Sequence, residues 1–146
     1  MSEQIEYVEL RFVDILGRLK AMTVPCEPAD TVQDVAKDPI LVEGTSIDGS
    51  SIVGMSAVEA SDLRLVPDPG SLMELPYSAQ RIAAAMCFVA EKDGNLSHEP
   101  THPLDSRGVL QSVCERYLPK NMHLRVKVEP EFHFITGEGE PIDGAG

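Results

Sequence analysis

Two glutamates separated by one residue, Glu129 and Glu131, are the side chains best suited to metal chemistry in this sequence. They lie within residues 125–135, where apolar and polar residues alternate strictly. On a β-strand, this alternation places both carboxylates on one face, about 7 Å apart along the chain. Like charges so placed repel unless solvent or a cation separates them, and hard cations such as Mg²⁺ prefer carboxylate oxygens. The pattern predicts a divalent-metal site, but it also fits a solvated sheet face on which Lys127 offsets the charge.

A second group of polar side chains, Asp48, Ser50 and Ser51, falls within residues 44–56, which are rich in glycine and serine. This composition predicts a loop, and a surface turn is its simplest interpretation. It is not a phosphate-binding loop, because no Gly-Lys followed by Ser or Thr comes after it. The residues alone therefore leave its role open.

Residues 98–102 match the H-E-x-x-H pattern of zinc proteases in letters only. The two histidines of that pattern must share one face of an uninterrupted helical turn. Pro100 and Pro103 interrupt any such turn. We therefore predict that His98 and His102 are exposed loop residues and not zinc ligands.

The sequence carries 24 acidic and 12 basic residues among 146, which gives a net charge of −12. A field of this sign repels phosphate backbones and anionic membranes, so we expect neither a nucleic-acid nor a membrane partner. The N-terminus is acidic, unlike a signal peptide, and no long apolar run follows it. Cys26, Cys87 and Cys114 form no C-x-x-C pair. We therefore predict free thiols and a cytoplasmic protein.

The elements that must position the loop are strands in the first part of the chain. Residues 5–13 and 18–24 have the composition of two strands, and the glycine-containing turn between them predicts an antiparallel hairpin. Further strands are expected at 63–67 and 71–75. The most apolar segment, 81–89, is expected to be a central strand.

One short helix is expected among these strands. It should begin at Asp30 or Thr31, because both residues are good N-caps, and run to about Lys37. Residues 38–39, Asp-Pro, should end it. Strands of mixed direction around one short helix predict an α+β fold with a mixed sheet.

The glutamate pair is expected at the end of a separate helix–strand unit. Its helix, residues 105–118, has one apolar stripe at 3.6-residue spacing, and Asp105 or Ser106 can cap it. Gly108 inside this helix costs about 1 kcal/mol relative to alanine, so tertiary packing must hold the helix. A strand over 124–135 should follow. One helix and one strand cannot form a core, so we expect the rest of their domain to be missing from the chain.

Taken together and in order, several segments resemble the glutamine synthetase family. The resemblance covers nearly the whole chain, and four motifs in the correct order and spacing carry it. They are residues 12–17, which resemble the opening hairpin of the family, 47–52 with Gly54, which resemble its F-D-G-S-S-I loop, 61–68, which resemble its S-D-x-x-L-x-P-D segment, and 128–132, which resemble its P-E-x-E-F strand.

The resemblance implies an N-terminal β-grasp domain over residues 1–98 and the beginning of the catalytic domain over 104–146. The family joins ammonia to glutamate by way of γ-glutamyl phosphate, using ATP and Mg²⁺ or Mn²⁺. Its homo-oligomeric rings have active sites between subunits.

The resemblance also implies roles for four residues of this chain. Glu129 and Glu131 would each bind a different divalent cation at the phosphoryl-transfer site. Asp48, with Ser51 nearby, would reach into the neighbouring subunit's site and help to bind and deprotonate ammonium. The other catalytic residues would lie beyond Gly146, so we expect the 146-residue chain alone to be inactive.

Three departures from the family pattern leave alternatives open. Ile47 stands where the family loop usually has Phe, residues 55–56 replace an aromatic expected after the loop, and His133 replaces a second aromatic. A ligase that joins glutamate to another amine is therefore one alternative. A free-standing β-grasp module that regulates or assembles with a full-length synthetase is another. A reading frame that continues past Gly146 would favour the synthetase, and a stop codon there would favour the module.

Overall fold

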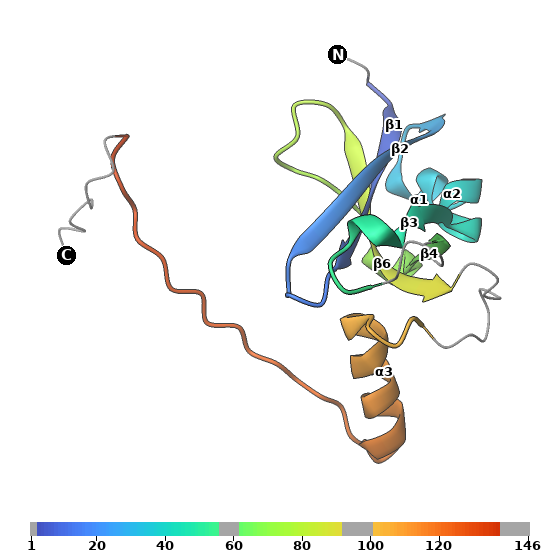
Figure 1. Ribbon diagram of the computed structural model, residues 1–146. Coiled ribbons are helices and arrows are strands. Elements are labelled where there is room, and N and C mark those ends of the chain that lie inside the picture. The colour runs from blue at the N-terminus through green and yellow to red at the C-terminus, as the bar shows by residue number, and fades with distance from the viewer. Residues whose placement is uncertain (1–2, 56–61, 92–100, 138–146) are drawn as a thin grey trace.

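A six-stranded mixed sheet forms the framework of the chain (Figure 1). The computed structural model describes residues 3–55, 62–91 and 101–137. The strands follow the order β2-β1-β6-β4-β3, and β5 also pairs with β6. The pair β1–β6 is parallel and the other pairs are antiparallel. The strands are β1 (Ile5–Val13), β2 (Leu19–Ala29), β3 (Thr45–Asp48), β4 (Asp62–Pro67), β5 (Met73–Glu74) and β6 (Ile82–Glu91). This arrangement confirms the predicted α+β class and the β-grasp-like mixed sheet.

The predicted hairpin of β1 and β2 is confirmed, with β2 extending five residues further than the sequence indicated. Asp14, which is 1% exposed, closes its turn because its carboxylate accepts hydrogen bonds from the backbone N–H groups of Leu16 and Arg18, both at 2.9 Å. Gly17 in the same turn has a φ of 76°, which a glycine adopts without strain.

Two short helices lie where one was predicted. In α1 (Val32–Val35), Thr31 is the N-cap and its hydroxyl accepts a hydrogen bond from the Asp34 N–H. The first helix ends before residues 38–39, as predicted, but these two residues also begin a second helix. The Asp38 carboxylate caps α2 (Pro39–Glu43) by accepting the Ile40 N–H at 2.8 Å, and proline fits the first turn of a helix because it needs no donor there.

The prediction of a loop over residues 44–56 is also wrong in part. Residues Thr45–Asp48 form the edge strand β3, and Gly49–Ser51 form the 3₁₀ turn η1. Each residue of β3 pairs with a residue of β4, and this pairing turns the first part of the predicted loop into a strand. After β4 the chain makes a second 3₁₀ turn, η3 (Pro69–Ser71), and the predicted strand at 71–75 shrinks to the two residues of β5.

The core lies on one face of the sheet. The central strand β6 contributes Ala83, Ala85, Cys87 and Val89 to it, all buried. The two short helices cover this core through a single buried side chain each, Val35 in α1 and Leu41 in α2.

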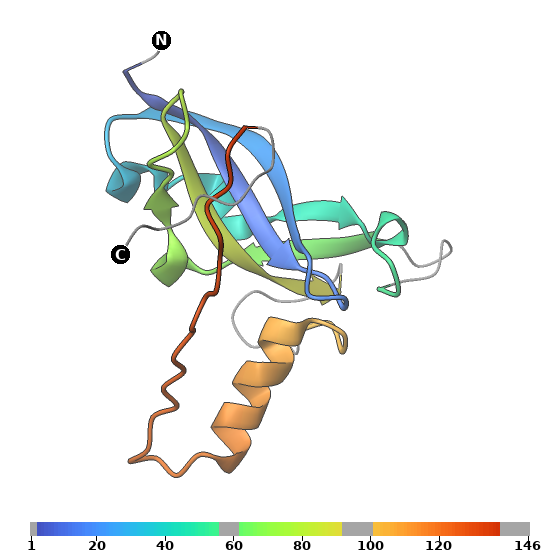
Figure 2. The same cartoon turned by 90° about the vertical axis from the view of Figure 1, so that its left-hand side faces the viewer.

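The predicted helix over 105–118 is confirmed as α3 (Ser106–Tyr117), with Asp105 as its N-cap. Its apolar stripe is not covered by other parts of the described chain, since Val109, Leu110 and Tyr117 are 47%, 55% and 69% exposed. Figure 2 shows the helix meeting the sheet at one end only. No helix in the described residues is long and apolar enough to cross a membrane.

The strand predicted over 124–135 is wrong for the chain as folded. Residues 122–134 are extended but belong to no strand, and they run away from the sheet (Figure 1). An extended segment becomes a strand only where another strand satisfies its backbone groups, and the described chain offers it no ladder of hydrogen bonds. The turn and linker predicted over 92–100 lie outside the described residues.

Candidate functional site

Asp48 occupies an exposed position at the point where the edge strand β3 turns into η1. Its Oδ1 accepts hydrogen bonds from the backbone N–H of Ser50 at 2.9 Å and from the Ser50 hydroxyl at 2.7 Å. The Ser51 hydroxyl donates to the Asp48 carbonyl at 2.8 Å. These bonds fix the turn and hold the carboxylate in one orientation. A held, solvent-facing carboxylate is suited to binding a small cation.

An open pocket of about 460 Å³ lies beside this turn, between the β1–β2 hairpin and β3. Asp48 and Ser51 line it together with Lys20. Phe12 and Ile52, which are nearly buried, form part of its apolar wall. The structure therefore brings the two predicted catalytic residues, Asp48 and Ser51, to one concave surface.

Gly54, which follows the η1 turn, has a backbone conformation that favours glycine. Its φ is 79°, and a Cβ added there would come to 2.4 Å from Cδ1 of Ile15 in the β1–β2 turn. The positive φ favours glycine, whereas the end of the flexible Ile15 side chain could shift to admit a Cβ. The η1 turn and the tip of the hairpin are thus packed against each other, which limits the freedom of the segment that carries Asp48.

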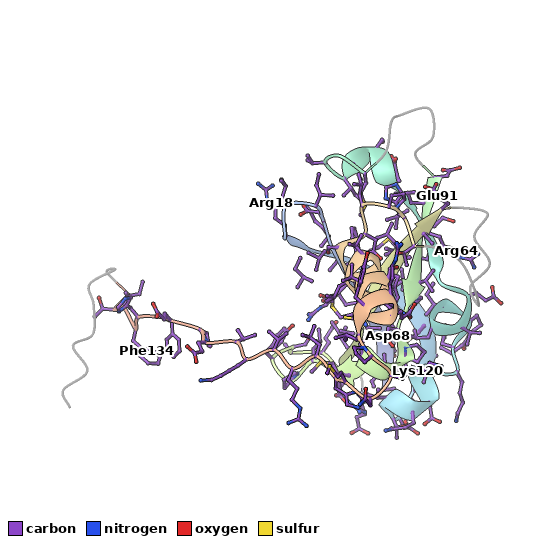
Figure 3. The ribbon with its side chains drawn as sticks, turned by 90° about the horizontal axis from the view of Figure 1, so that it is seen from below. Arg18, Arg64, Asp68, Glu91, Lys120 and Phe134 are labelled. Carbon is purple, nitrogen blue, oxygen red and sulfur yellow. The ribbon has the colours of Figure 1, made fainter. Side chains whose placement is uncertain are left out.

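Glu129 and Glu131 lie on the extended segment, exposed and far from the sheet. The Lys127 ammonium forms an ion pair with the Glu129 carboxylate, as the solvated-face interpretation expects. Phe132 and Phe134 stack edge to face, with ring centroids 5.3 Å apart. Figure 3 shows Phe134 well away from the sheet, so the chain does not bring the glutamate pair together with Asp48.

The donor atoms of Glu129 and Glu131 suit a hard cation, but they do not complete a site. Mg²⁺ takes about six oxygen ligands, several of them often waters. In residues 3–55, 62–91 and 101–137, no group of three or more His, Cys, Asp or Glu side chains could hold an ion. The pair therefore has the right chemistry for part of a cation site and lacks the remaining ligands.

His102 differs from its prediction as an exposed loop residue, because it is only 7% exposed. The imidazole Nδ1 accepts a hydrogen bond from the Leu104 N–H at 3.2 Å. The backbone N–H of His102 donates to the Val89 carbonyl at 2.7 Å. His102 thus closes the turn that leads into α3. His98 lies outside the described residues.

The three cysteines are free thiols, as predicted. Cys87 is buried in β6, and this burial raises the pKa of its thiol to about 12. Burial also raises the pKa of the Cys26 thiol. Neither thiol is suited to nucleophilic chemistry, because the thiolate is the reactive form.

Sequence reasoning missed two contacts at the start of α3. It assigned Asp105 only a capping role, and it did not single out Arg107 in the first turn. The Asp105 carboxylate is 1% exposed and contacts both the helix and β6. Arg107 pairs with Asp68, which lies beside α3 (Figure 3). The sequence held no local signal for these contacts, because Asp68 lies 39 positions from Arg107 along the chain.

Comparison with known proteins gives a consistent result. The family model "Glutamine synthetase, beta-Grasp domain" matches residues 4–92. A glutamine synthetase from Cereibacter sphaeroides is 36% identical over 92 residues, which cover 63% of this chain and 18% of that protein. A glutamine synthetase from Pyrococcus abyssi is 33% identical over 134 residues, or 92% of this chain and 27% of that protein.

Solved structures agree with this result. The chain aligns with a structure titled "GmaS/ADP complex" with a TM-score of 0.58 and 27% identity, over 77% of this chain and 23% of that one. It shares its fold with a Plasmodium falciparum glutamine synthetase at a TM-score of 0.56 and 23% identity, over 77% of this chain and 19% of that one. The chain therefore spans about a quarter or less of the proteins named here. Because the family model matches more than half of its residues, the chain belongs to the glutamine synthetase family and carries the β-grasp domain of that family.

Proposed function

We propose that this chain is the N-terminal part of an ATP-dependent glutamate–ammonia ligase, which serves glutamine biosynthesis and nitrogen assimilation. Residues 1–98 form its β-grasp domain and residues 104–146 begin its catalytic domain. The observation that carries the proposal is the Asp48 turn. Within the family's β-grasp domain, this turn holds an exposed carboxylate in a fixed orientation beside an open pocket.

Asp48 and Ser51 act at the active site of a neighbouring subunit in a homo-oligomeric ring. A carboxylate stabilises NH₄⁺ by charge and by hydrogen bonding, and it can accept a proton as the amine becomes a nucleophile. The position of Asp48 at the edge of the sheet supports this role, because an edge residue is accessible to another subunit. Ser51 supports the turn by its bond to the Asp48 carbonyl.

Glu129 and Glu131 supply carboxylate oxygens to two divalent cations, Mg²⁺ or Mn²⁺, in the catalytic domain. Such cations neutralise the charge of a phosphoryl group during its transfer from ATP. The chain's own part is to present two carboxylates on a segment that other residues must cover. The exposure of that segment and the shortage of further ligands among the described residues support the proposal that the chain alone is inactive.

Two measurements test the proposal. The purified chain should release no phosphate from Mg-ATP in the presence of glutamate and ammonium, because it lacks a complete site. A hybrid in which it replaces the 134 aligned residues of the Pyrococcus abyssi enzyme should assemble and turn over. Clear turnover by the chain alone would contradict the proposed inactivity. A hybrid that assembles, as judged by light scattering, but is inactive would contradict the proposed function.

The same hybrid addresses the alternative acceptors. The pocket beside Asp48 has apolar walls as well as the carboxylate, which is compatible with an amine larger than ammonia. Turnover with methylammonium or ethylammonium in preference to ammonium would indicate a ligase of glutamate to another amine.

A further inference from the structure

The first turn of α3 is fastened to the sheet through one buried carboxylate. Asp105 is 1% exposed. Its Oδ2 accepts the Val89 N–H of β6 at 3.3 Å and the Gly108 N–H of α3 at 3.1 Å. A single oxygen thus bridges the central strand and the helix. Replacing it would leave two buried N–H groups without an acceptor, which is costly inside a protein.

Arg107 makes a second attachment from the same turn. Its guanidinium forms an ion pair with Asp68, the N-cap of η3, and lies 4.6 Å from the centre of the Phe88 ring in β6. Stacking of a planar guanidinium on a ring together with an ion pair fixes its direction as well as its distance. The helix is therefore attached both to β6 and to the start of η3.

The turn that precedes α3 adds a third attachment. Thr101 forms a bridge with Ala90 of β6, and the His102 N–H donates to the Val89 carbonyl. A Cβ added at Gly108 would come to 1.7 Å from Oγ1 of Thr101, so the helix approaches this turn as closely as glycine allows. This close approach explains a glycine inside a helix, and it confirms that tertiary packing holds α3 at its start.

From Val109 onward, the described residues give the helix no such support. Its apolar stripe is exposed, and the segment that follows it is extended and exposed. The helix is thus fixed at one end and projects from the sheet, and it carries the chain toward Glu129 and Glu131.

We propose that Asp105 and Arg107 are positioning residues that make α3 move as one body with the β-grasp sheet. The attachment itself is independent of the proposed function. The consequence of this attachment for the active sites rests on the proposed function. In that function, Asp48 would act at the site of a neighbouring subunit, whereas Glu129 and Glu131 would act at the site of their own subunit. A helix fastened to the sheet then ties two adjacent active sites of a ring to one rigid element.

Residual dipolar couplings of backbone amides in the full 146-residue chain test the attachment directly. In the wild type, one alignment tensor should fit the amides of both the sheet and α3. Arg107→Ala and Asp105→Ala should require a separate tensor for α3 and should speed hydrogen exchange of the Gly108 amide by about 10-fold. Exchange of the β6 amides facing β1 should not change, because the sheet stays folded.

Matched variants keep the test specific. Arg116→Ala removes the same charge from the last turn of α3, where the guanidinium faces Tyr117 of its own helix, and should leave one tensor. Arg107→Lys keeps the ion pair and should restore most of the common alignment. If Asp105→Ala does not fold, Arg107→Ala decides the question. A wild-type helix that already needs its own tensor, or an Arg107→Ala helix that does not, would overturn the proposal. Because alignment is not activity, neither result depends on whether the proposed ligase function is correct.

Discussion

Residues 8–12 of strand β1 and the segment over 125–135 carry the same sequence signal, an alternation of apolar and polar residues, but they differ in structure. In β1 the apolar residues Val8 and Leu10 are fully buried, and both edges of the strand are paired, to β2 and to β6. In the later segment Val126 and Val128 are 76% and 78% exposed. The segment is extended but belongs to no strand.

The difference shows what alternation can and cannot determine. It divides a segment into two faces, and this division is local. Whether a neighbouring strand exists is a property of the rest of the protein. The β-grasp sheet supplies partners for β1 within the chain, whereas residues 125–135 would find theirs in the catalytic domain that we propose.

The largest expected contrast between the two regions is in thiol reactivity. Cys87 lies buried in β6, with a pKa of about 12, and Cys114 lies half-buried on α3. Alkylation of Cys87 requires opening of the sheet, so at pH 8 it should be at least about 1,000-fold slower than that of Cys114. Peptide mapping after timed iodoacetamide treatment measures both rates in one sample. Similar rates would mean that the sheet is not the rigid region.

A second contrast uses two identical substitutions. Val8→Ala removes two methyl groups from the core and should lower the free energy of unfolding by about 2 kcal/mol. Val128→Ala should change it by less than about 0.5 kcal/mol, since its side chain contacts solvent. Urea unfolding followed by circular dichroism measures both. Equal effects would show that residues 125–135 pack against the domain in solution.

The smallest effect concerns the junction between the two regions. Burial raises the pKa of the Asp105 carboxyl, against the lowering influence of the Val89 and Gly108 N–H groups and of the Arg107 charge. The folded state then binds the proton more tightly than the unfolded state. The stabilising contribution of Asp105 therefore falls as pH rises from the ordinary aspartate pKa through the raised one, and it is constant above that.

Comparison of the wild type with Asp105→Asn isolates this contribution from the other carboxylates, including Asp68 at η3 and Glu91 of β6, which face Arg107 and His102. The stability of the wild type relative to Asp105→Asn should decline across that window. Urea unfolding at a series of pH values provides the measurement. A relative stability that instead rises with pH would show that the N–H donors and Arg107 outweigh burial.

The sequence predicted the elements that depend on local patterns and missed those that depend on partners elsewhere in the protein. The hairpin, the central strand and α3 were predictable, because their signals are local periodicity and capping residues. Strand β3 was not, since it is only four residues long, lies in a segment rich in glycine and serine, and forms by pairing with β4. The helix α2 was not predicted, because Asp38 and Pro39 are as typical of a helix start as of a helix end.

The candidate site shows a similar limit. The motifs indicated Asp48 and Ser51, but only the fold shows the pocket beside them and the bonds from Ser50 that orient the carboxylate. The attachment of α3 by Asp105 and Arg107 depends on contacts between residues up to 39 positions apart, which no local pattern encodes.

The role of Asp48 is most directly tested in the assembled hybrid with the Pyrococcus abyssi enzyme. The measurement is kcat/KM for ammonium in the parent hybrid, in Asp48→Asn and in Asp34→Asn, which removes an equal charge from the exposed helix α1. We expect Asp48→Asn to lower kcat/KM by at least about 100-fold, because a neutral amide neither holds NH₄⁺ by charge nor accepts its proton. Asp34→Asn should stay within about twofold of the parent. An Asp48→Asn hybrid as active toward ammonium as its parent would contradict the account.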